Sequence, residues 1–135
     1  VAKSKSGIVM RLDPGAPLGP GDQVRFEVFT TWPRAEIALL MLDGAGQVSP
    51  LAPSGERSLP IVGGRPILLE QAFELDDHPG PERVVLVGCA EPVRMADLMT
   101  SARKALAEAQ GEPRLVKTLG TGCHEESFWI SKVQP

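Results

Sequence analysis

Apolar and polar residues alternate through residues 23–31 (QVRFEVFTT), and this period of two predicts a β-strand with one buried face. Val24, Phe26 and Val28 fall on one side of this strand, whereas the charged residues between them fall on the other. We therefore expect the first side to cover a hydrophobic core and the second side to face solvent.

Two other stretches, residues 36–42 (EIALLML) and 82–90 (ERVVLVGCA), are apolar at consecutive positions. Short apolar runs between turn residues predict strands that are buried on both faces. The first run is followed by the turn sequence Asp-Gly-Ala-Gly at residues 43–46 and then by residues 47–51. These two strands are predicted to form a β-hairpin in which the glycines take positive φ angles.

Thirteen prolines and fourteen glycines divide the rest of the chain into short pieces, which favours strands joined by turns over a helical bundle. Further strands are predicted over residues 8–12, 67–75 and 127–133, which brings the total to about seven. A long connection rich in proline and glycine holds at most one more short strand, near residues 59–62.

The hydrophobic period changes to three and four between residues 93 and 110, which predicts an amphipathic helix that Gly111 ends. Its apolar stripe consists mainly of alanine with leucine and methionine, and small side chains of this kind suit close packing on a sheet. We therefore predict one domain over residues 1–135, mainly β, with the architecture of an immunoglobulin-like β-sandwich and one α-helix inserted before the last strand. A curled barrel is the alternative.

Fourteen basic and seventeen acidic residues give a formal charge of -3 and are interspersed along the chain. A nucleic-acid partner is not expected, because such partners require clustered Lys and Arg. No apolar run approaches the roughly 18 residues of a membrane span, so we expect no direct membrane insertion by this segment. The chain begins at Val1, and we interpret it as a processed form or a piece of a longer protein.

The chain has two cysteines, Cys89 and Cys123, each next to a predicted strand on either side of the helix. We predict a disulfide between them, which would close a loop around the helix and contribute roughly 4 kcal/mol to stability on the chain-entropy estimate. Such a bond implies an oxidising compartment. The alternative is two reduced cysteines, one of them buried and inert.

A nucleophilic cysteine would need a histidine base, and His78 and His124 are the histidines of the chain. Because His124 directly follows Cys123, the two side chains would point to opposite faces of an extended strand. The spacing of these residues also lacks the paired pattern of a zinc site, and residues 43–46 lack the alternating oxygen ligands of a calcium loop. We therefore predict no catalytic residue, no metal and no cofactor.

Two glycine-rich turns, at residues 63–65 and 120–122, do not match a phosphate-binding P-loop and are predicted to be ordinary turns. Residues 76–78 (Asp-Asp-His) are likewise interpreted as a solvated turn. Glu82 and Arg83 are expected to form a pair at the surface or rim of the domain.

Aromatic residues make up only 4% of the chain, and Phe29 and Trp32 fall where they would form an exposed apolar patch. Exposed patches of this kind mark protein contacts. The alternative places both side chains in a second packing layer under the helix.

Four motifs together characterise the chain: GDQVRFEV at residues 21–28, LLMLDGAGQVSPLAP at 39–53, LDDHPGPERVVLVGCAEP at 75–92 and SFWISK at 127–132. With these motifs the chain resembles a bacterial domain of unknown function over nearly its whole length, from about residue 8 to residue 132. Domains of that type occur in envelope-facing parts of bacterial proteins, for instance behind the membrane span of anti-sigma-factor-like regulators. They also occur as accessory modules beside kinase or caspase-like domains.

The resemblance implies turns at residues 21–22, 43–46 and 80–83, and it implies no catalytic residue. In one place the chain departs from the family pattern: residues 51–55 read Leu-Ala-Pro-Ser-Gly, where relatives often have an aromatic residue followed by proline and a glycine pair. Any binding function of that loop in relatives is therefore in doubt for this chain.

From these observations we expect a non-catalytic sensing or protein-interaction module, located on the extracytoplasmic (periplasmic) side of a bacterial envelope as part of a membrane-anchored regulator. Its partner is expected to be a protein. The alternative is a cytoplasmic accessory domain beside an enzyme such as a kinase or a caspase-like protease, with reduced cysteines. A cysteine hydrolase is the third hypothesis, and it would require an unusually reactive thiol.

Overall fold

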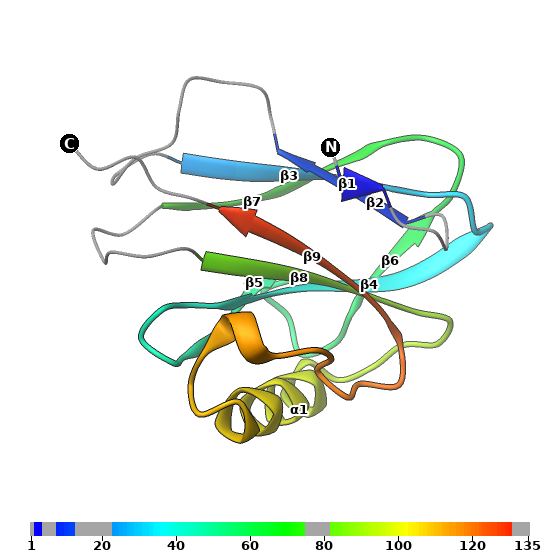
Figure 1. Cartoon of the computed structure of the whole chain (residues 1–135). Coiled ribbons are helices and arrows are strands. Elements are labelled where there is room, and N and C mark those ends of the chain that lie inside the picture. Colours follow the sequence, from blue (N-terminus) through cyan, green and yellow to red (C-terminus); the bar gives the residue numbers. More distant parts are fainter. Residues whose placement is uncertain (1, 4–7, 13–22, 75–81, 131–135) are drawn as a thin grey trace.

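The computed structural model describes residues 2–3, 8–12, 23–74 and 82–130, which form three layers (Figure 1). Four strands make an outer sheet and five strands make a central sheet, and the helix packs on the other side of the central sheet. The helix is α1 (Met95–Glu108), and the 3-10 helix η1 (Pro113–Leu115) follows it. The strands are β1 (Ala2–Lys3), β2 (Ile8–Leu12), β3 (Gln23–Thr30), β4 (Arg34–Leu42), β5 (Val48–Ala52), β6 (Leu59–Val62), β7 (Ile67–Glu74), β8 (Glu82–Cys89) and β9 (His124–Ile130).

Both sheets are antiparallel, which confirms the prediction of a mainly β chain with a helix before its last strand. The outer sheet has the order β1-β2-β3-β7, and the central sheet has the order β5-β4-β8-β9, with β6 also paired to β4. Strand β4 is long enough for two partners on one side, because residues 34–37 pair with β6 and residues 39–42 pair with β5. On its other side β4 pairs with β8.

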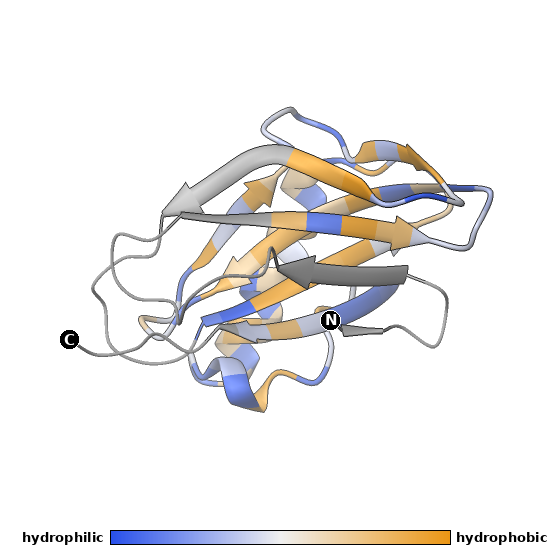
Figure 2. Ribbon diagram, turned by 90° about the horizontal axis from the view of Figure 1, so that it is seen from above, coloured by the Kyte–Doolittle hydropathy of each residue, from blue (hydrophilic) through white to orange (hydrophobic). Residues whose placement is uncertain are grey.

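The side chains of β4 and β8 alternate between two hydrophobic cores, so both strands are buried on both faces, as their sequences predict. One core lies between the two sheets, and the other lies between the central sheet and α1. Figure 2 shows apolar residues along the strands and polar residues on many of the loops between them. The first core includes Phe26, Ile37, Leu39, Val84 and Leu86, and the second includes Leu40, Leu42, Val85, Val87, Leu98 and Leu106.

The predicted hairpin is present as β4 and β5, and its turn is organised by Asp43. The Oδ1 atom of Asp43 accepts hydrogen bonds from the backbone N–H groups of Ala45 and Gln47, both at 2.9 Å. Of the two turn glycines only Gly46 takes a positive φ, of 82°. The prediction that both glycines do so was wrong for Gly44, because the aspartate side chain already closes the first half of the turn.

Helix α1 begins at Met95 and ends at Glu108, within the predicted range of residues 93–110. Its end is a Schellman motif, in which Gly111 N–H donates to Leu106 O over 2.8 Å and Gln110 N–H donates to Ala107 O over 3.0 Å. The left-handed position next to the C-cap is occupied by Gln110, with φ of 58°, and Gly111 follows with φ of 76°. The first residue with a positive φ after the helix is therefore Gln110, and the predicted stop residue, Gly111, comes one residue later.

The described strands match the seven predicted ones, and the short strand near residues 59–62 is β6. Two details differ from prediction. Strand β1, of two residues, was not predicted, because two residues carry no periodicity. The last strand was predicted to start at Ser127 but starts at His124, directly after Cys123. The predicted turns at residues 21–22 and 76–78, the first two residues of the turn at 80–83, and the end of the last predicted strand lie outside the described residues.

Candidate functional site

A groove runs beside α1, between the later turns of the helix and a connecting segment that we define as residues 113–123. Two adjoining cavities of about 260 Å³ and 240 Å³ form it, and they share Ala105, Glu108 and Thr118. We call this surface the α1 groove. Its remaining lining residues are Ser101, Lys104, Ala109, Leu115, Val116, Lys117, Leu119 and Gly120.

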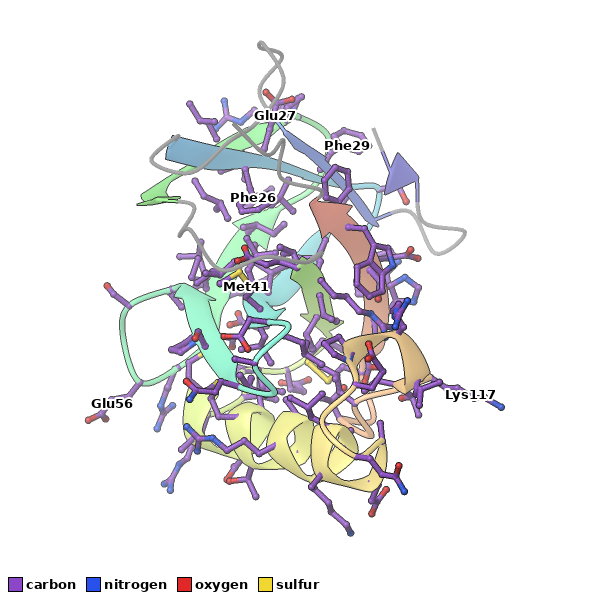
Figure 3. All side chains as sticks on the ribbon, turned by 60° about the vertical axis from the view of Figure 1, so that its left-hand side comes forward. Phe26, Glu27, Phe29, Met41, Glu56 and Lys117 are labelled. Atoms are coloured by element: carbon purple, nitrogen blue, oxygen red, sulfur yellow. A yellow bond between two sulfur atoms is a disulfide. The ribbon has the colours of Figure 1, made fainter. Side chains whose placement is uncertain are left out.

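The α1 groove combines small apolar side chains with a charged rim. Ala105 and Ala109 form the helix side, and Leu115, which is 63% exposed, presents its side chain at one end. Lys104 stands on the helix wall and Lys117 on the wall formed by the connecting segment, and Figure 3 shows Lys117 extending away from the body of the domain. An apolar floor with a polar rim is typical of surfaces that bind a protein segment.

The connecting segment is held in place by the carboxylate of Glu125, which belongs to β9. Its Oε1 atom accepts from Leu119 N–H over 2.7 Å and from the Thr118 hydroxyl over 3.1 Å. Its Oε2 atom accepts from the N–H and the hydroxyl of Thr121, over 3.2 Å and 2.6 Å. In the glycine-rich loop at residues 120–122, Thr121 therefore donates to a carboxylate of the chain itself, and Gly120 N–H donates to the Thr118 hydroxyl over 3.0 Å.

Arg83, on β8, binds the first residues of the connecting segment. Its Nη1 donates to Pro113 O over 2.8 Å and also to Val116 O, and its Nε donates to the hydroxyl of Ser127 over 2.9 Å. The guanidinium carbon lies 5.7 Å from the ring centroid of Trp129. Burial lowers the pKa of the Arg83 guanidinium, and the negative charge of Glu125 opposes this shift.

Cys89 and Cys123 form a disulfide, with an S–S distance of 2.11 Å across a sequence separation of 34 residues. The bond joins the end of β8 to the residue before β9, and both cysteines pack into the core beneath α1. With both thiols bonded, neither is available as a thiolate nucleophile, so the cysteine-hydrolase hypothesis would first require reduction. The disulfide is the third attachment of the connecting segment, after Arg83 and Glu125.

The beginning of α1 is fixed by a separate buried polar contact. Glu36, only 4% exposed, accepts a hydrogen bond from the Ser58 hydroxyl over 2.8 Å, and the same hydroxyl oxygen accepts from Val93 N–H over 3.0 Å. Met95 N–H then donates to Glu56 O over 2.8 Å. The start of α1 is therefore attached to β4 through Ser58.

A third cavity, of about 400 Å³, lies beside these contacts at the start of α1. Its lining residues are Glu56, Arg57, Arg94, Met95 and Ala96. Three of these residues, Glu56, Arg57 and Arg94, are charged. The backbones of Arg57 and Arg94 are joined by an isolated β-bridge. The turn at residues 63–65 lies elsewhere in the fold and is closed by the backbone, since Gly63 N–H donates to Pro33 O and Gly64 N–H donates to Thr30 O, both over 3.1 Å.

The predicted patch residues occupy two different environments. Trp32 is half-buried against the core between the sheets, and its ring meets the ring of His124 edge-on at 6.3 Å. His124 Nε2 lies 2.8 Å from Glu126 Oε1. Phe29 is also half-buried, and alternation along β3 places it on the outer face, opposite to the core residues of that strand. A protein contact at Phe29 and Trp32 stays a prediction.

Sequence reasoning misplaced the pair Glu82 and Arg83. Glu82 is buried, at 2% exposure, and Arg83 reaches under the connecting segment instead of standing at a surface rim. The prediction was wrong because β8 lies between two strands, which encloses even its first residues. The role of Glu125 was missed because the last strand was started at Ser127; a start at His124 would have placed Glu125 on the same face as Ser127.

Within the described residues, no group of three or more His, Cys, Asp or Glu side chains gathers in a way that could hold a metal ion. His78, one of the histidines considered for metal or base chemistry, lies outside these residues. No helix of the described part is long and apolar enough to cross a membrane.

No family model, curated protein or solved structure matches this chain. The resemblance to a bacterial domain of unknown function therefore stays a prediction that depends on the four motifs.

Proposed function

We propose that this domain is a non-catalytic protein-interaction module of a bacterial membrane-anchored regulator, located on the extracytoplasmic side of the envelope, and that it binds its partner in the α1 groove. In architecture we assign it to the immunoglobulin-like β-sandwiches. The two antiparallel sheets with a shared core support this assignment, with α1 and the connecting segment as an added layer.

The observation that carries the proposal is the disulfide between Cys89 and Cys123, together with the segment that it holds. A disulfide of this kind is stable in an oxidising compartment, which favours the extracytoplasmic location over the cytoplasmic accessory domain. The same bond, with Arg83 and Glu125, fixes one wall of the α1 groove before any partner arrives. A preformed groove binds with a smaller loss of conformational entropy than a mobile one.

The groove chemistry indicates the kind of partner. Alanines on the helix and the exposed Leu115 suit an apolar side chain of a partner segment. The two lysines on opposite walls suit acidic residues of the partner, placed away from Glu108, which lines both cavities. Within the described residues neither Lys104 nor Lys117 takes part in an ion pair with Asp or Glu. Their charges thus remain available to a partner.

The location is tested by intact mass after alkylation under denaturing conditions, on protein recovered from the periplasm of a bacterial host. We expect alkylation of both cysteines only after reduction, with no dimer mass. Labelling of both thiols without reduction would sink the extracytoplasmic proposal and favour the cytoplasmic accessory domain.

The interaction is tested with a photo-crosslinking amino acid at position 115 of the full-length parent protein in its own host. The matched control carries the same amino acid at Val62, which is 66% exposed and distant from the α1 groove in sequence and fold. We expect a protein that crosslinks from position 115 but not from position 62, and that binds the purified domain at least about tenfold more weakly when Ala105→Arg fills the groove. Equal crosslinking from both positions, or unchanged binding by the Ala105→Arg variant, would contradict the proposal that the partner binds in the α1 groove.

A further inference from the structure

The two edges of the central sheet differ in whether they can accept another strand. One edge is formed by β5 and β6, and each of these short strands contains a proline, Pro50 and Pro60. Proline has no N–H to donate to a neighbouring strand, and it is a common device by which sheets block their edges. The pairing of β4 with β5 is also interrupted by a register shift between Leu39 and Leu40.

The opposite edge is β9, and it lacks these obstacles. Its seven residues, HEESFWI, include no proline and no glycine, and they pair with β8 in an unbroken register. Among the strands of the described ranges, β9 pairs with β8 alone. Figure 3 shows β9 at one margin of the central sheet and β5 at the other. The backbone edge of β9 is therefore a regular template for a further strand.

Charged side chains protect many natural sheet edges, but the two carboxylates of β9 are engaged elsewhere. Glu125 accepts four hydrogen bonds from the connecting segment, and Glu126 lies against His124. Both carboxylates are therefore bound within their own chain, and a strand that pairs with β9 must keep its own carboxylates away from them. The exposed aromatic Trp129, at 40% exposure, instead adds an apolar contact surface along this edge.

We propose that two copies of this chain pair through β9, antiparallel about a two-fold axis at Ser127, so that their central sheets join into one continuous sheet. An antiparallel pair of identical strands is self-complementary, so the same strand edge can supply hydrogen-bond donors and acceptors in both copies. In this register Ser127 lies opposite Ser127 of the partner subunit. Glu126 lies opposite Phe128 of the partner subunit, and Glu125 lies opposite Trp129 of the partner subunit.

The charges of the strand exclude the neighbouring registers toward its start and are compatible with an axis at Ser127. An axis at Glu126, or between Glu125 and Glu126, would place carboxylates directly opposite each other, which destabilises a sheet pair. With the axis at Ser127, Glu125 approaches Trp129 of the partner subunit. In each copy the Arg83 guanidinium lies against the ring of Trp129. Opposite charges therefore lie near each other across the seam. The pairing uses the backbone edge of β9, none of whose residues lines the α1 groove, so dimerisation and binding in the groove are measured by separate experiments.

The first test is sedimentation equilibrium of the unmodified protein, compared with Ser127→Asp and Ser49→Asp. The Ser127→Asp variant keeps an oxygen acceptor for Arg83 but sets two carboxylates opposite each other across the axis. Ser49→Asp makes the same change on β5, at the blocked edge. We expect a concentration-dependent dimer whose Kd rises at least about tenfold for Ser127→Asp and stays unchanged for Ser49→Asp. A monomer at all concentrations up to about 1 mM overturns the proposal.

The register is tested by Ser127→Cys, with Ser49→Cys as the control, on non-reducing gels after mild oxidation. Two cysteines directly opposite each other in neighbouring antiparallel strands lie close enough to bond, so we expect a covalent dimer of Ser127→Cys that reductant converts to monomer. Ser49→Cys should stay monomeric on the same gel. Dimerisation without crosslinking at position 127, or equal crosslinking at position 49, overturns the assignment of β9 as the interface.

Discussion

Thr121 donates to Glu125 Oε2 twice, through its hydroxyl over 2.6 Å and through its backbone N–H over 3.2 Å. The threonine belongs to the loop before β9, and the glutamate belongs to β9 itself. Because the other carboxylate oxygen holds Thr118 and Leu119, a single strand residue binds the loop at three positions. This loop is one wall of the α1 groove, so the geometry of the groove depends on Glu125.

We expect Glu125→Gln to lower the free energy of unfolding by about 1–3 kcal/mol. An amide nitrogen cannot accept the hydrogen bonds that one carboxylate oxygen accepts, so loop donors lose their partner. Urea denaturation followed by circular dichroism measures the change. Glu126→Gln is the matched control, since it makes the same change at a carboxylate that contacts His124 Nε2 at 2.8 Å, and we expect a loss of at most about 1 kcal/mol. Equal losses in the two variants would contradict the special role of Glu125.

Arg83→Lys should destabilise the domain by about 1–3 kcal/mol although it conserves the charge. A lysine ammonium lacks the planar fork that reaches Ser127 on one side and the carbonyls of Pro113 and Val116 on the other. The same denaturation experiment checks the change, and backbone NMR shifts at residues 113–118 check its location. Arg103→Lys, at an exposed position on α1, should change neither stability nor these shifts. If Arg83→Lys leaves both readouts unchanged, the guanidinium does not hold the segment.

Removal of the disulfide by the double substitution Cys89→Ala and Cys123→Ala should cost about 2–4 kcal/mol. The unfolded chain gains freedom when the loop of 34 residues is opened, while the core under α1 keeps its other residues. Guanidinium denaturation of the oxidised protein, the reduced protein and the double variant provides the comparison. Reductant should lower the midpoint of the unmodified protein and leave that of the double variant in place. If reductant also lowers the denaturation midpoint of the double variant, its effect on the unmodified protein cannot be assigned to the disulfide.

Gln110→Gly should raise the free energy of unfolding by about 1 kcal/mol. Gln110 has φ of 58° at the end of α1, a conformation that costs a residue with a Cβ atom and that glycine adopts freely. Thermal denaturation measures the gain. Gln110→Ala is the control, since alanine loses the glutamine side chain but keeps the Cβ penalty, and it should bring no comparable gain. If both variants stabilise equally, the backbone conformation is not the cause.

Much of the fold follows from patterns within single segments. The alternation around Phe26, the apolar run at residues 84–87 and the spacing of three and four between Met95 and Leu106 indicated a half-buried strand, a fully buried strand and a helix. The disulfide between Cys89 and Cys123 was predicted from their positions beside strands. Such features are predictable because burial of one face or of both faces of an element requires apolar residues at a regular spacing in the sequence.

The start of the last strand and the burial of Glu82 were not predictable in the same way. His124, Glu125 and Glu126 are polar, so the hydrophobic pattern gives no sign of a strand there. Their strand conformation depends on β8, which offers an unbroken series of partners from Glu82 to Gly88. Pairing with a buried neighbour thus overrides a weak local preference.

Local periodicity and turn residues are enough to predict most of the strands, the helix and the cysteine pair, because these features depend on neighbours in the chain. The contacts of Arg83 and Glu125 with the connecting segment, the contact of Glu36 with Ser58 and the edge position of β9 depend instead on how the elements pack. Hydrogen bonds and strand order join residues far apart in the chain, and their geometry arises only when the sheets and the helix pack together. The α1 groove belongs to this second group, since its two walls come from segments that tertiary contacts bring side by side.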